Sequence, residues 1–447
     1  MHLSIHKLKQ HFDLLALHRV NPKRYPYLLE SQSISDVSRF SILFAYPDKQ
    51  IQSEFKDGSK FLETLTKEFI SENDIKHESH LPFRGGWFVY LGYELAQEIE
   101  PSLDLQADSF DLPMAIATRV PAAIIIDHIA NETWFVDEEK DETRYQQALA
   151  DIAAIKPCDG QGVSSIQAVQ CEDADEAYLT AVDRISKYIK QGDVFQVNLS
   201  RSWQVSLNDD LSSSQIYETL RERNPAPFAA LANFENFSII SSSPERLVRV
   251  NNGIAETRPI AGTRPRGDSV LKDQALLEEL LAHPKERAEH IMLIDLERND
   301  LGRITKPGTV EVDELMTIES YEYVHHIVSN IRGELKKDVT PADVIAAVFP
   351  GGTITGCPKV RCMEIISELE NTGRGPYTGS LGYINKNGDM DSNILIRTLV
   401  KKGQDIHFRT GAGIVFDSIP KNELLETRHK AKGLLKVFDT ETIESND

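Results

Sequence analysis

Hydrophobic and polar positions along the chain follow two different periods. Short apolar or alternating runs, which are typical of strands, lie at 40–45, 86–91 and 122–126. From 177 to 189 the apolar residues recur every three or four positions, which predicts a helix that ends at Gly192. Alternation resumes at 194–199 and predicts a strand directly after that glycine.

The remainder of the chain mixes both periods without a regular strand–helix–strand repeat. We expect further strands at 237–241, 247–250, 379–384, 393–400 and 405–409, and helices at 270–300, 341–348, 358–370 and 420–437. This order predicts an α+β fold, a large composite unit of two mainly antiparallel sheets with surrounding helices, and argues against a doubly wound fold. The polar, acidic stretch at 156–172 predicts a linker between an N-terminal region, 1–155, and a second region, 173–440.

Composition and charge argue against several classes of function. Hydrophobic residues make up 40% and charged residues 26% of the 447, which is ordinary for a globular protein. The net charge of −20 argues against a nucleic-acid partner, because such a surface repels phosphate backbones. No apolar run approaches the roughly 18 residues of a membrane span, and we see no secretory signal. The four cysteines form no C-x-x-C pair, so we expect a reduced, cytoplasmic location.

Carboxylates recur at helical spacing in two segments. Glu286, Glu289 and His290 share one helix face, and Glu423 and Glu426 share another, with Lys430 one turn further on. Carboxylates from two helices could together supply the hard oxygen ligands that Mg²⁺ prefers. A solvated face with internal ion pairs explains the same spacing, and the spacing alone favours that interpretation.

Three other features have both a structural and a functional interpretation. Arg397, between apolar neighbours, either pairs internally or binds an anion, and His326 is either a core residue or a catalytic one. Gly411 and Gly413 either form a turn or let the backbone approach a ligand. No cysteine has the G-x-C-x-G context of a glutamine-hydrolysing nucleophile, so the chain shows no sign of making ammonia from glutamine.

Together these stretches resemble the chorismate-utilising enzyme family. The match covers nearly the whole chain and is strongest over 173–437, through GDVFQVNLSR, SSPERL, TRPIAGTRPRG, HPKERAEHIMLIDLERNDLGR, FPGGTITGCPKVRCMEII, GDMDSNILIRT and GAGIVFDS. The family includes anthranilate synthase component I, aminodeoxychorismate synthase component I, isochorismate synthase and salicylate synthase. The resemblance implies the family's fold, an α+β unit of two packed sheets with surrounding helices.

The resemblance also implies roles for particular residues. Glu289 and Glu426 match the principal Mg²⁺ ligands, with Glu423 nearby, and Mg²⁺ is the implied cofactor. Glu245 matches the general acid that protonates the departing C4 hydroxyl of chorismate, so we expect a raised pKa; His326 matches a histidine close to the reacting ring. Substrate-contacting positions of the family match Gly262, Thr263, Tyr377, Arg397, Gly411, Gly413 and Lys430.

Gln196 separates members of the family by their nucleophile. Members that use water carry a lysine at this position, whereas members that use ammonia resemble this chain in having glutamine. The resemblance therefore implies an ammonia-dependent enzyme, and argues against isochorismate or salicylate synthesis. Since the chain has no glutaminase nucleophile, it also implies a separate glutamine amidotransferase subunit as partner.

Two ammonia-dependent branches remain open. Motifs around Gln196, 354–356, His326 and 380–382 look more like aminodeoxychorismate synthase component I, the branch that we favour. Ala261 is of the anthranilate synthase type, because an alanine cannot form the covalent adduct made by a lysine at this position in some aminodeoxychorismate synthases. Leu29, Glu30 and Ser31 resemble the family's tryptophan-binding element and predict a tryptophan pocket in either branch.

Overall fold

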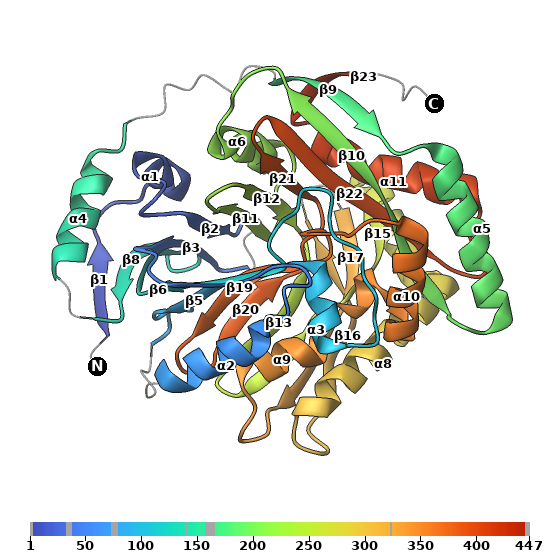
Figure 1. The fold of residues 1–447 in the computed structure, drawn as a ribbon, viewed down its shortest axis with the longest axis horizontal. Coiled ribbons are helices and arrows are strands. Elements are labelled where there is room, and N and C mark those ends of the chain that lie inside the picture. Colours follow the sequence, from blue (N-terminus) through green and yellow to red (C-terminus); the bar gives the residue numbers. More distant parts are fainter. Residues whose placement is uncertain are drawn as a thin grey trace.

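Two large sheets form the centre of the protein in a computed structural model (Figure 1). The structure describes residues 3–32, 38–72, 79–139, 142–156, 166–321 and 324–442. All strand pairs but one are antiparallel, and helices surround the sheets, so the predicted α+β class is confirmed.

The first sheet has 13 strands and runs through most of the chain. Its order is β1 (Ser4–Leu8), β8 (Glu132–Asp137), β7 (Ala122–Asp127), β3 (Phe40–Ala45), β2 (Tyr27–Glu30), β11 (Phe228–Asn233), β12 (Ser238–Ser243), β21 (Thr398–Lys402), β22 (Asp405–Ile414), β10 (Gln196–Leu207), β9 (Ile166–Glu172) and β23 (Phe438–Thr442), with β18 (Gly356–Cys357) beside β10. The one parallel pair is β9 with β23.

The second sheet has 10 strands. Its order is β15 (Ile260–Pro265), β17 (Val324–Glu334), β14 (Ile254–Thr257), β13 (Arg246–Asn251), β20 (Met390–Asn393), β19 (Ser380–Asn385), β5 (Gly86–Leu91), β6 (Ala115–Val120) and β4 (Gln50–Ser53), with β16 (Glu311–Ser320) beside β17.

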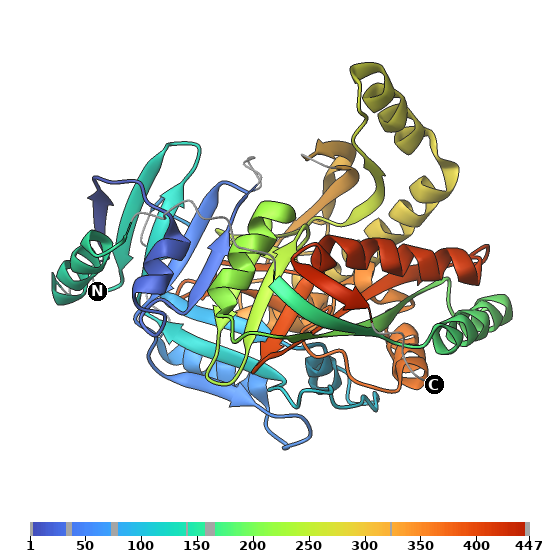
Figure 2. The ribbon, with the colours of Figure 1, turned by 90° about the horizontal axis from the view of Figure 1, so that it is seen from above.

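Helices cover the outer faces of the sheets. They are α1 (Leu14–Val20), α2 (Phe61–Glu72), α3 (Ala96–Ile99), α4 (Glu142–Ala153), α5 (Asp175–Gln191), α6 (Ser213–Arg223), α7 (Val270–Ala282), α8 (Pro284–Ile304), α9 (Pro341–Val348), α10 (Lys359–Glu370) and α11 (Pro420–Leu435), with 3₁₀ turns at Tyr93–Leu95 and Gly352–Ile354. α11 packs on β22 and beside α5. Figure 2 shows α7 and the adjoining part of α8, in olive and yellow, projecting from the rest of the molecule. No helix in the described ranges is long and apolar enough to cross a membrane.

The two sheets pack face to face through an apolar core. Tyr27 and Phe44 of the first sheet meet Phe88 and Tyr383 of the second, and the rings of Tyr27 and Phe88 stack at 4.1 Å between centroids. Burying a side chain of this size stabilises the fold by about 1.5–3 kcal/mol. The core therefore joins segments that are hundreds of residues apart in sequence.

Strands from both predicted regions, 1–155 and 173–440, share each sheet. β2 pairs with β11 in the first sheet, and β5 pairs with β19 in the second. The predicted boundary between the two regions therefore does not coincide with a boundary between the two sheets. The division into 1–155 and 173–440 stays a prediction. Of the predicted linker, 157–165 lies outside the described residues, and 166–172 is strand β9, so the linker prediction is wrong there.

Two other predictions are corrected. The helix predicted at 270–300 is two helices, because Pro284 has no N–H to donate and begins α8 instead of continuing α7. The strand predicted at 393–400 is broken: β20 ends at Asn393 and β21 begins at Thr398. Between them Arg397 has a φ of 51°, a left-handed conformation that a strand cannot contain.

Candidate functional site

Two glycines of β22 make room for larger side chains at one end of the first sheet. A Cβ atom added to Gly413 would lie 2.6 Å from Nε2 of Gln196, and one added to Gly411 would lie 2.9 Å from the hydroxyl oxygen of Tyr377. Both distances are too short for a real Cβ, so these positions need glycine for Gln196 and Tyr377 to stay where they are. The fold thus brings four of the predicted residues together.

Gln196 turns its side chain into the protein at the start of β10. Only 8% of the residue is exposed. Its Oε1 atom is buried and has no hydrogen-bond partner in the described part of the chain. A buried amide oxygen without a partner costs free energy, so it is suited to accept a hydrogen bond from a bound ligand.

A buried network of charges holds Tyr377 in place. Glu370 accepts hydrogen bonds from Arg374 at 2.7 Å and from Arg409 at 2.9 Å. The Arg374 guanidinium lies over the Tyr377 ring, 5.5 Å from its centroid. Burial raises the pKa of the Tyr377 hydroxyl to about 12, although the charge of Arg374 acts in the opposite direction. Tyr377 is therefore a neutral hydrogen-bond donor.

Glu245 is a buried carboxyl between β12 and β13. It is 5% exposed, and the Ile260 N–H donates a hydrogen bond to its Oε1 at 3.3 Å. Burial raises the pKa of Glu245 to about 7, even though Thr353, Ile260 and the charge of Arg397 lower it. A carboxyl with this pKa holds its proton near neutral pH, as a general acid requires.

His326 lies on β17 and is close enough to Arg397 to feel its charge. It pairs with Thr263 of β15, next to an irregularity of the strand at Gly262. Burial, together with the nearby charge of Arg397, lowers the pKa of His326 to about 3. Because His326 is neutral, it can donate or accept a hydrogen bond but does not carry a positive charge. An added Cβ at Gly262 would overlap the Glu286 carboxylate, so this bend also depends on glycine.

The segment 353–357 connects the two groups of residues. Thr353 lies beside Glu245. Two residues later, the Thr355 carbonyl accepts a hydrogen bond from the Asn198 N–H at 2.9 Å, and Cys357 of β18 pairs with Gln196. One short segment therefore links the acid on the second sheet to the amide on the first.

Lys430 ties α11 to the glycine-containing strand. Its Nζ donates a hydrogen bond to the Gly411 carbonyl oxygen at 2.9 Å and pairs with Glu426 at 2.8 Å. About half of the Lys430 side chain is exposed, so the ammonium can still meet an anion from solvent.

The three carboxylates predicted to bind Mg²⁺ come from two helices. Glu289 lies on α8, whereas Glu423 and Glu426 lie one turn apart on α11. Within the described ranges, no three His, Cys, Asp or Glu side chains are close enough together to hold a metal. Mg²⁺ is usually held by one or two carboxylates, with water and a substrate anion as its other ligands, so the assignment of these three residues stays a prediction.

Comparison with known proteins agrees with this arrangement. A family model described as chorismate binding enzyme matches residues 25–436. The chain belongs to this family.

Two relatives and one solved structure are similar over most of their length. The chain is 45% identical over 361 residues to an anthranilate synthase component I-like protein of Synechocystis sp., covering 80% of this chain and 74% of that protein. It is 43% identical over 380 residues to aminodeoxychorismate synthase component 1 of Bacillus subtilis, covering 82% and 80%. The crystal structure of anthranilate synthase component I from Streptococcus pneumoniae matches with a TM-score of 0.79 at 32% identity, covering 90% and 93%.

In this chorismate binding enzyme, Glu297 is a buried acid that the sequence analysis did not identify. Glu297 of α8 is 8% exposed, and burial raises its pKa to about 8, helped by the negative charges of Glu245 and Asp300. Its position between the buried Ile294 and Leu301 puts it on the apolar face of α8. A glutamate on an apolar helix face was the signal available in the sequence.

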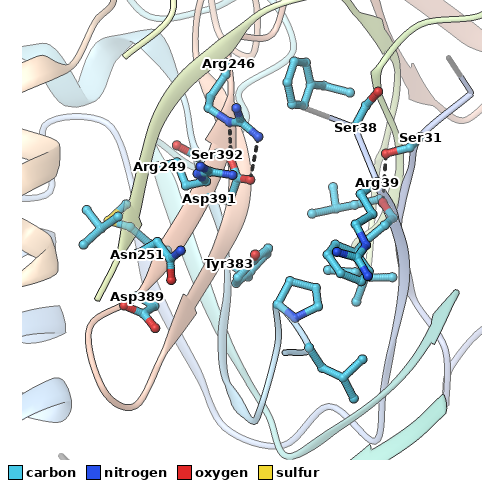
Figure 3. Close-up of a pocket in the computed structure, with 18 of the residues that line it drawn as sticks. Ser31, Ser38, Arg39, Arg246, Arg249, Asn251, Tyr383, Asp389, Asp391 and Ser392 are labelled. Atoms are coloured by element: carbon cyan, nitrogen blue, oxygen red, sulfur yellow. Dashed lines mark hydrogen bonds and ion pairs between the residues drawn. The ribbon is translucent and has the colours of Figure 1, made fainter. Parts of the chain in front are cut away.

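A large cavity of this chorismate binding enzyme, which we call the N-terminal cavity, lies between residues 29–84 of the N-terminal region and residues 227–253 and 381–393 (Figure 3). Its volume is about 1240 Å³, and Leu29, Glu30 and Ser31, predicted for a tryptophan pocket, line it. The Ser31 hydroxyl donates to the Phe40 carbonyl at 2.8 Å.

Not every predicted pocket residue is available to a ligand. The Glu30 carboxylate accepts hydrogen bonds from Tyr217 at 2.7 Å and Arg221 at 3.2 Å, so its charge is already satisfied. By contrast, the Ser392 hydroxyl, also in the cavity wall, is buried without a hydrogen-bond partner in the described part of the chain.

Proposed function

We propose that the chain aminates chorismate with ammonia and releases 4-amino-4-deoxychorismate. The observation that carries this proposal is the position of Glu245, a buried acid with a raised pKa, beside Arg397 and joined by one short segment to Gln196. An acid, a cation and an unpaired amide oxygen are the groups needed to lose a hydroxyl, hold an anion and receive a nitrogen nucleophile.

In this proposal each residue has a separate task. Glu245 donates its proton to the departing C4 hydroxyl, which leaves as water. Arg397 and Lys430 bind the carboxylates of the substrate, and Tyr377 donates a hydrogen bond from its neutral hydroxyl. Gln196 accepts a hydrogen bond from ammonia, which attacks without a general base because neutral ammonia is a far better nucleophile than neutral water. The ammonium group formed with the new C–N bond then loses its extra proton to water.

Backbone and ring contacts complete the proposed binding site. Gly262, Thr263, Gly411 and Gly413 let the main chain approach the substrate. His326, which stays neutral, faces the ring without adding charge.

The alternative product is anthranilate, formed with loss of pyruvate. Ala261 favours it, since an alanine at this position cannot form a covalent adduct with the ring. The solved relative from Streptococcus pneumoniae is named as an anthranilate synthase component. We favour the first product because the motifs around Gln196 and His326 resemble that branch, and because the Bacillus subtilis relative carries the corresponding name.

The proposal includes Mg²⁺ as cofactor, bound by Glu289 of α8 and by Glu423 and Glu426 of α11. This assignment is supported by the preference of Mg²⁺ for carboxylate oxygens. Adding Mg²⁺ together with chorismate should raise the unfolding temperature of the chain and leave that of Glu289→Gln unchanged. If the variant responds as strongly as the parent chain, Glu289 is not a ligand.

A separate glutamine amidotransferase is the proposed source of ammonia, in the cytoplasm. The relatives are named component 1 or component I, which is a name for one part of a larger enzyme. Among the described cysteines, Cys171, Cys357 and Cys362 are free thiols, as a reducing compartment requires. We also propose that the N-terminal cavity binds tryptophan.

A product assay tests the reaction. The purified chain is incubated with chorismate, Mg²⁺ and an ammonium salt, and the products are separated by chromatography with mass detection. A product that keeps the enolpyruvyl group, and that an added lyase converts to 4-aminobenzoate, supports the proposal. Anthranilate with pyruvate selects the alternative, and unchanged chorismate rejects both.

A further inference from the structure

Glu297 is a buried acid that the proposed mechanism does not use. It lies on the apolar face of α8, and its Oε2 atom is buried without a hydrogen-bond partner in the described part of the chain. Burying a polar group in this way costs free energy, and an apolar side chain would fill the same place without that cost. Packing therefore does not explain why this position holds a carboxyl.

The neighbouring buried acid, Asp300, is held differently. Its carboxylate accepts a hydrogen bond from Nζ of Lys359 at 2.5 Å, so its charge is neutralised by a direct ion pair. Besides Glu245, these two residues are the charged groups that act on Glu297. Because Lys359 pairs with Asp300 instead of Glu297, burial raises the pKa of Glu297 to about 8. At neutral pH Glu297 is a neutral carboxyl that carries a proton.

The segment from Thr257 to Ile260 reaches both Glu297 and Glu245. Thr257 of β14 lies beside the Glu297 carboxyl. Three residues later, at the start of β15, the Ile260 N–H donates a hydrogen bond to Oε1 of Glu245 at 3.3 Å. Four consecutive residues span at most about 11 Å between their first and last Cα atoms. The two acids are therefore held in one neighbourhood by this segment.

A second segment makes the same connection. A Cβ atom added to Gly352 would lie 2.7 Å from Cδ2 of Leu296, the residue that precedes Glu297 on α8. The residue after this glycine, Thr353, lies beside Glu245. In agreement with both connections, Glu297 is close enough to Glu245 to feel its negative charge.

The other charges near Glu245 do not replace a proton donor. Arg397 is the charged group that acts on Glu245, and we propose that it binds a substrate carboxylate. His326 of β17, which is close to Arg397, is neutral because its pKa is lowered to about 3. Glu245 has a pKa of about 7 and loses its proton before Glu297 does. When Glu245 ionises, Glu297 is therefore a neighbour that still carries a proton.

We propose that Glu297 is a positioning residue for the reaction, whose proton stabilises the negative charge that Glu245 acquires on protonating the departing hydroxyl. This inference rests on the proposed function. In that step the C4–O bond breaks, the oxygen leaves as water with the proton of Glu245, and Glu245 becomes a carboxylate. Glu297 keeps its proton and donates it in a hydrogen bond, directly or through one bridging water, which is nearly as effective. Glu245 afterwards regains a proton from solvent.

The pH dependence of the rate in three variants tests the inference. Glu297→Leu removes the donor, whereas Glu297→Gln keeps a neutral N–H donor. Asp295→Asn is the matched control, because it removes a carboxylate from the same helix at a position where 64% of the side chain is exposed. Rates of chorismate consumption are measured with an ammonium salt, at constant free ammonia, from about pH 6 to about pH 10.

We expect the alkaline midpoint of the rate to move in Glu297→Leu. A hydrogen bond to the charged form of a carboxyl lowers its pKa, so its loss should raise the midpoint by about one to two pH units. The rate below pH 7 should fall about tenfold, because the carboxylate that forms in the transition state is less stable. Glu297→Gln and the control should keep the parent's midpoint, and a rate within about twofold of the parent's.

Each other outcome contradicts a specific step. A Glu297→Leu variant with the parent's midpoint contradicts the inference, even if its rate is lower, because a merely structural role lowers the rate without moving the midpoint. An equal shift in Glu297→Gln shows that a proton donor at this position is not what acts on Glu245. If Glu297→Leu does not fold, Glu297→Met, which has a similar shape to glutamate, takes its place. A parent chain that consumes no chorismate with ammonium contradicts the proposed function itself.

Discussion

Gly413 leaves open the space that the side-chain amide of Gln196 occupies. An added Cβ would lie 2.6 Å from Gln196 Nε2. The residue that we propose to receive ammonia is therefore positioned by the absence of an atom on the neighbouring strand.

Gly413→Ala should displace Gln196 and lower the ammonium-dependent rate. Since a shift of about 1 Å can cost on the order of 100-fold in rate, we expect a loss of at least tenfold with a small change in unfolding temperature. Gly302→Ala is the control, because an added Cβ at Gly302 meets no atom within 4 Å. A Gly413→Ala variant with unchanged kinetics would show that Gln196 does not position the nucleophile.

The proton on Glu245 should control the rate above neutral pH. Burial raises its pKa to about 7, so the protonated form decreases as the pH rises through that value. With free ammonia held constant, the rate should fall about tenfold for each pH unit above 7. Glu245→Gln should lose about 100-fold or more and show no such fall, while Glu245→Asp should keep a titrating residual rate. Full activity in Glu245→Gln would remove Glu245 from the mechanism.

Glu297 should make stability depend on pH. Its folded-state pKa, about 8, lies above the ordinary value of 4.5, so its contribution to stability is complete below about 4.5 and is lost as the pH rises through 8. A tenfold difference in proton affinity between the folded and unfolded chains corresponds to about 1.4 kcal/mol of stability. The free energy of unfolding is measured in urea at about pH 5 and at about pH 9. It should decrease less between these two pH values in Glu297→Gln than in the parent chain. Glu222→Gln, at an exposed position of α6, should behave like the parent. If stability depends equally on pH in all three proteins, a group other than Glu297 is responsible for the pH dependence.

Tryptophan should stabilise the folded chain through the N-terminal cavity. A ligand at 100 times its Kd adds about 2.7 kcal/mol to the free energy of unfolding, which raises the unfolding temperature by several degrees. Ser31→Leu, which places a larger side chain in the cavity wall, should abolish the shift without changing the ammonium-dependent rate. Alanine is the control ligand, because it lacks the indole ring. If alanine stabilises the chain equally, the cavity does not recognise tryptophan.

Several elements were predictable because their causes are local. Gly192 ends α5 with a φ of 84°, which glycine adopts without strain, and the alternation of 40–45 and 86–91 reproduces β3 and β5. The helix predicted at 270–300 was wrong although its cause, Pro284, is visible in the sequence. There the apolar spacing continues across the proline and hides the break.

The sequence by itself determined the secondary structure of most segments and the chemical types of the candidate residues, because both depend on a few neighbouring positions. Only the tertiary structure decided that both sheets combine strands of both regions, and that Glu245 and Glu297 hold protons near neutral pH. A pKa depends on burial and on the hydrogen bonds and charges of distant segments, here a hydrogen bond from Thr353 and the charge of Arg397 beside Glu245. For the same reason the spacing of Glu289, Glu423 and Glu426 could not show how α8 and α11 place them relative to one another.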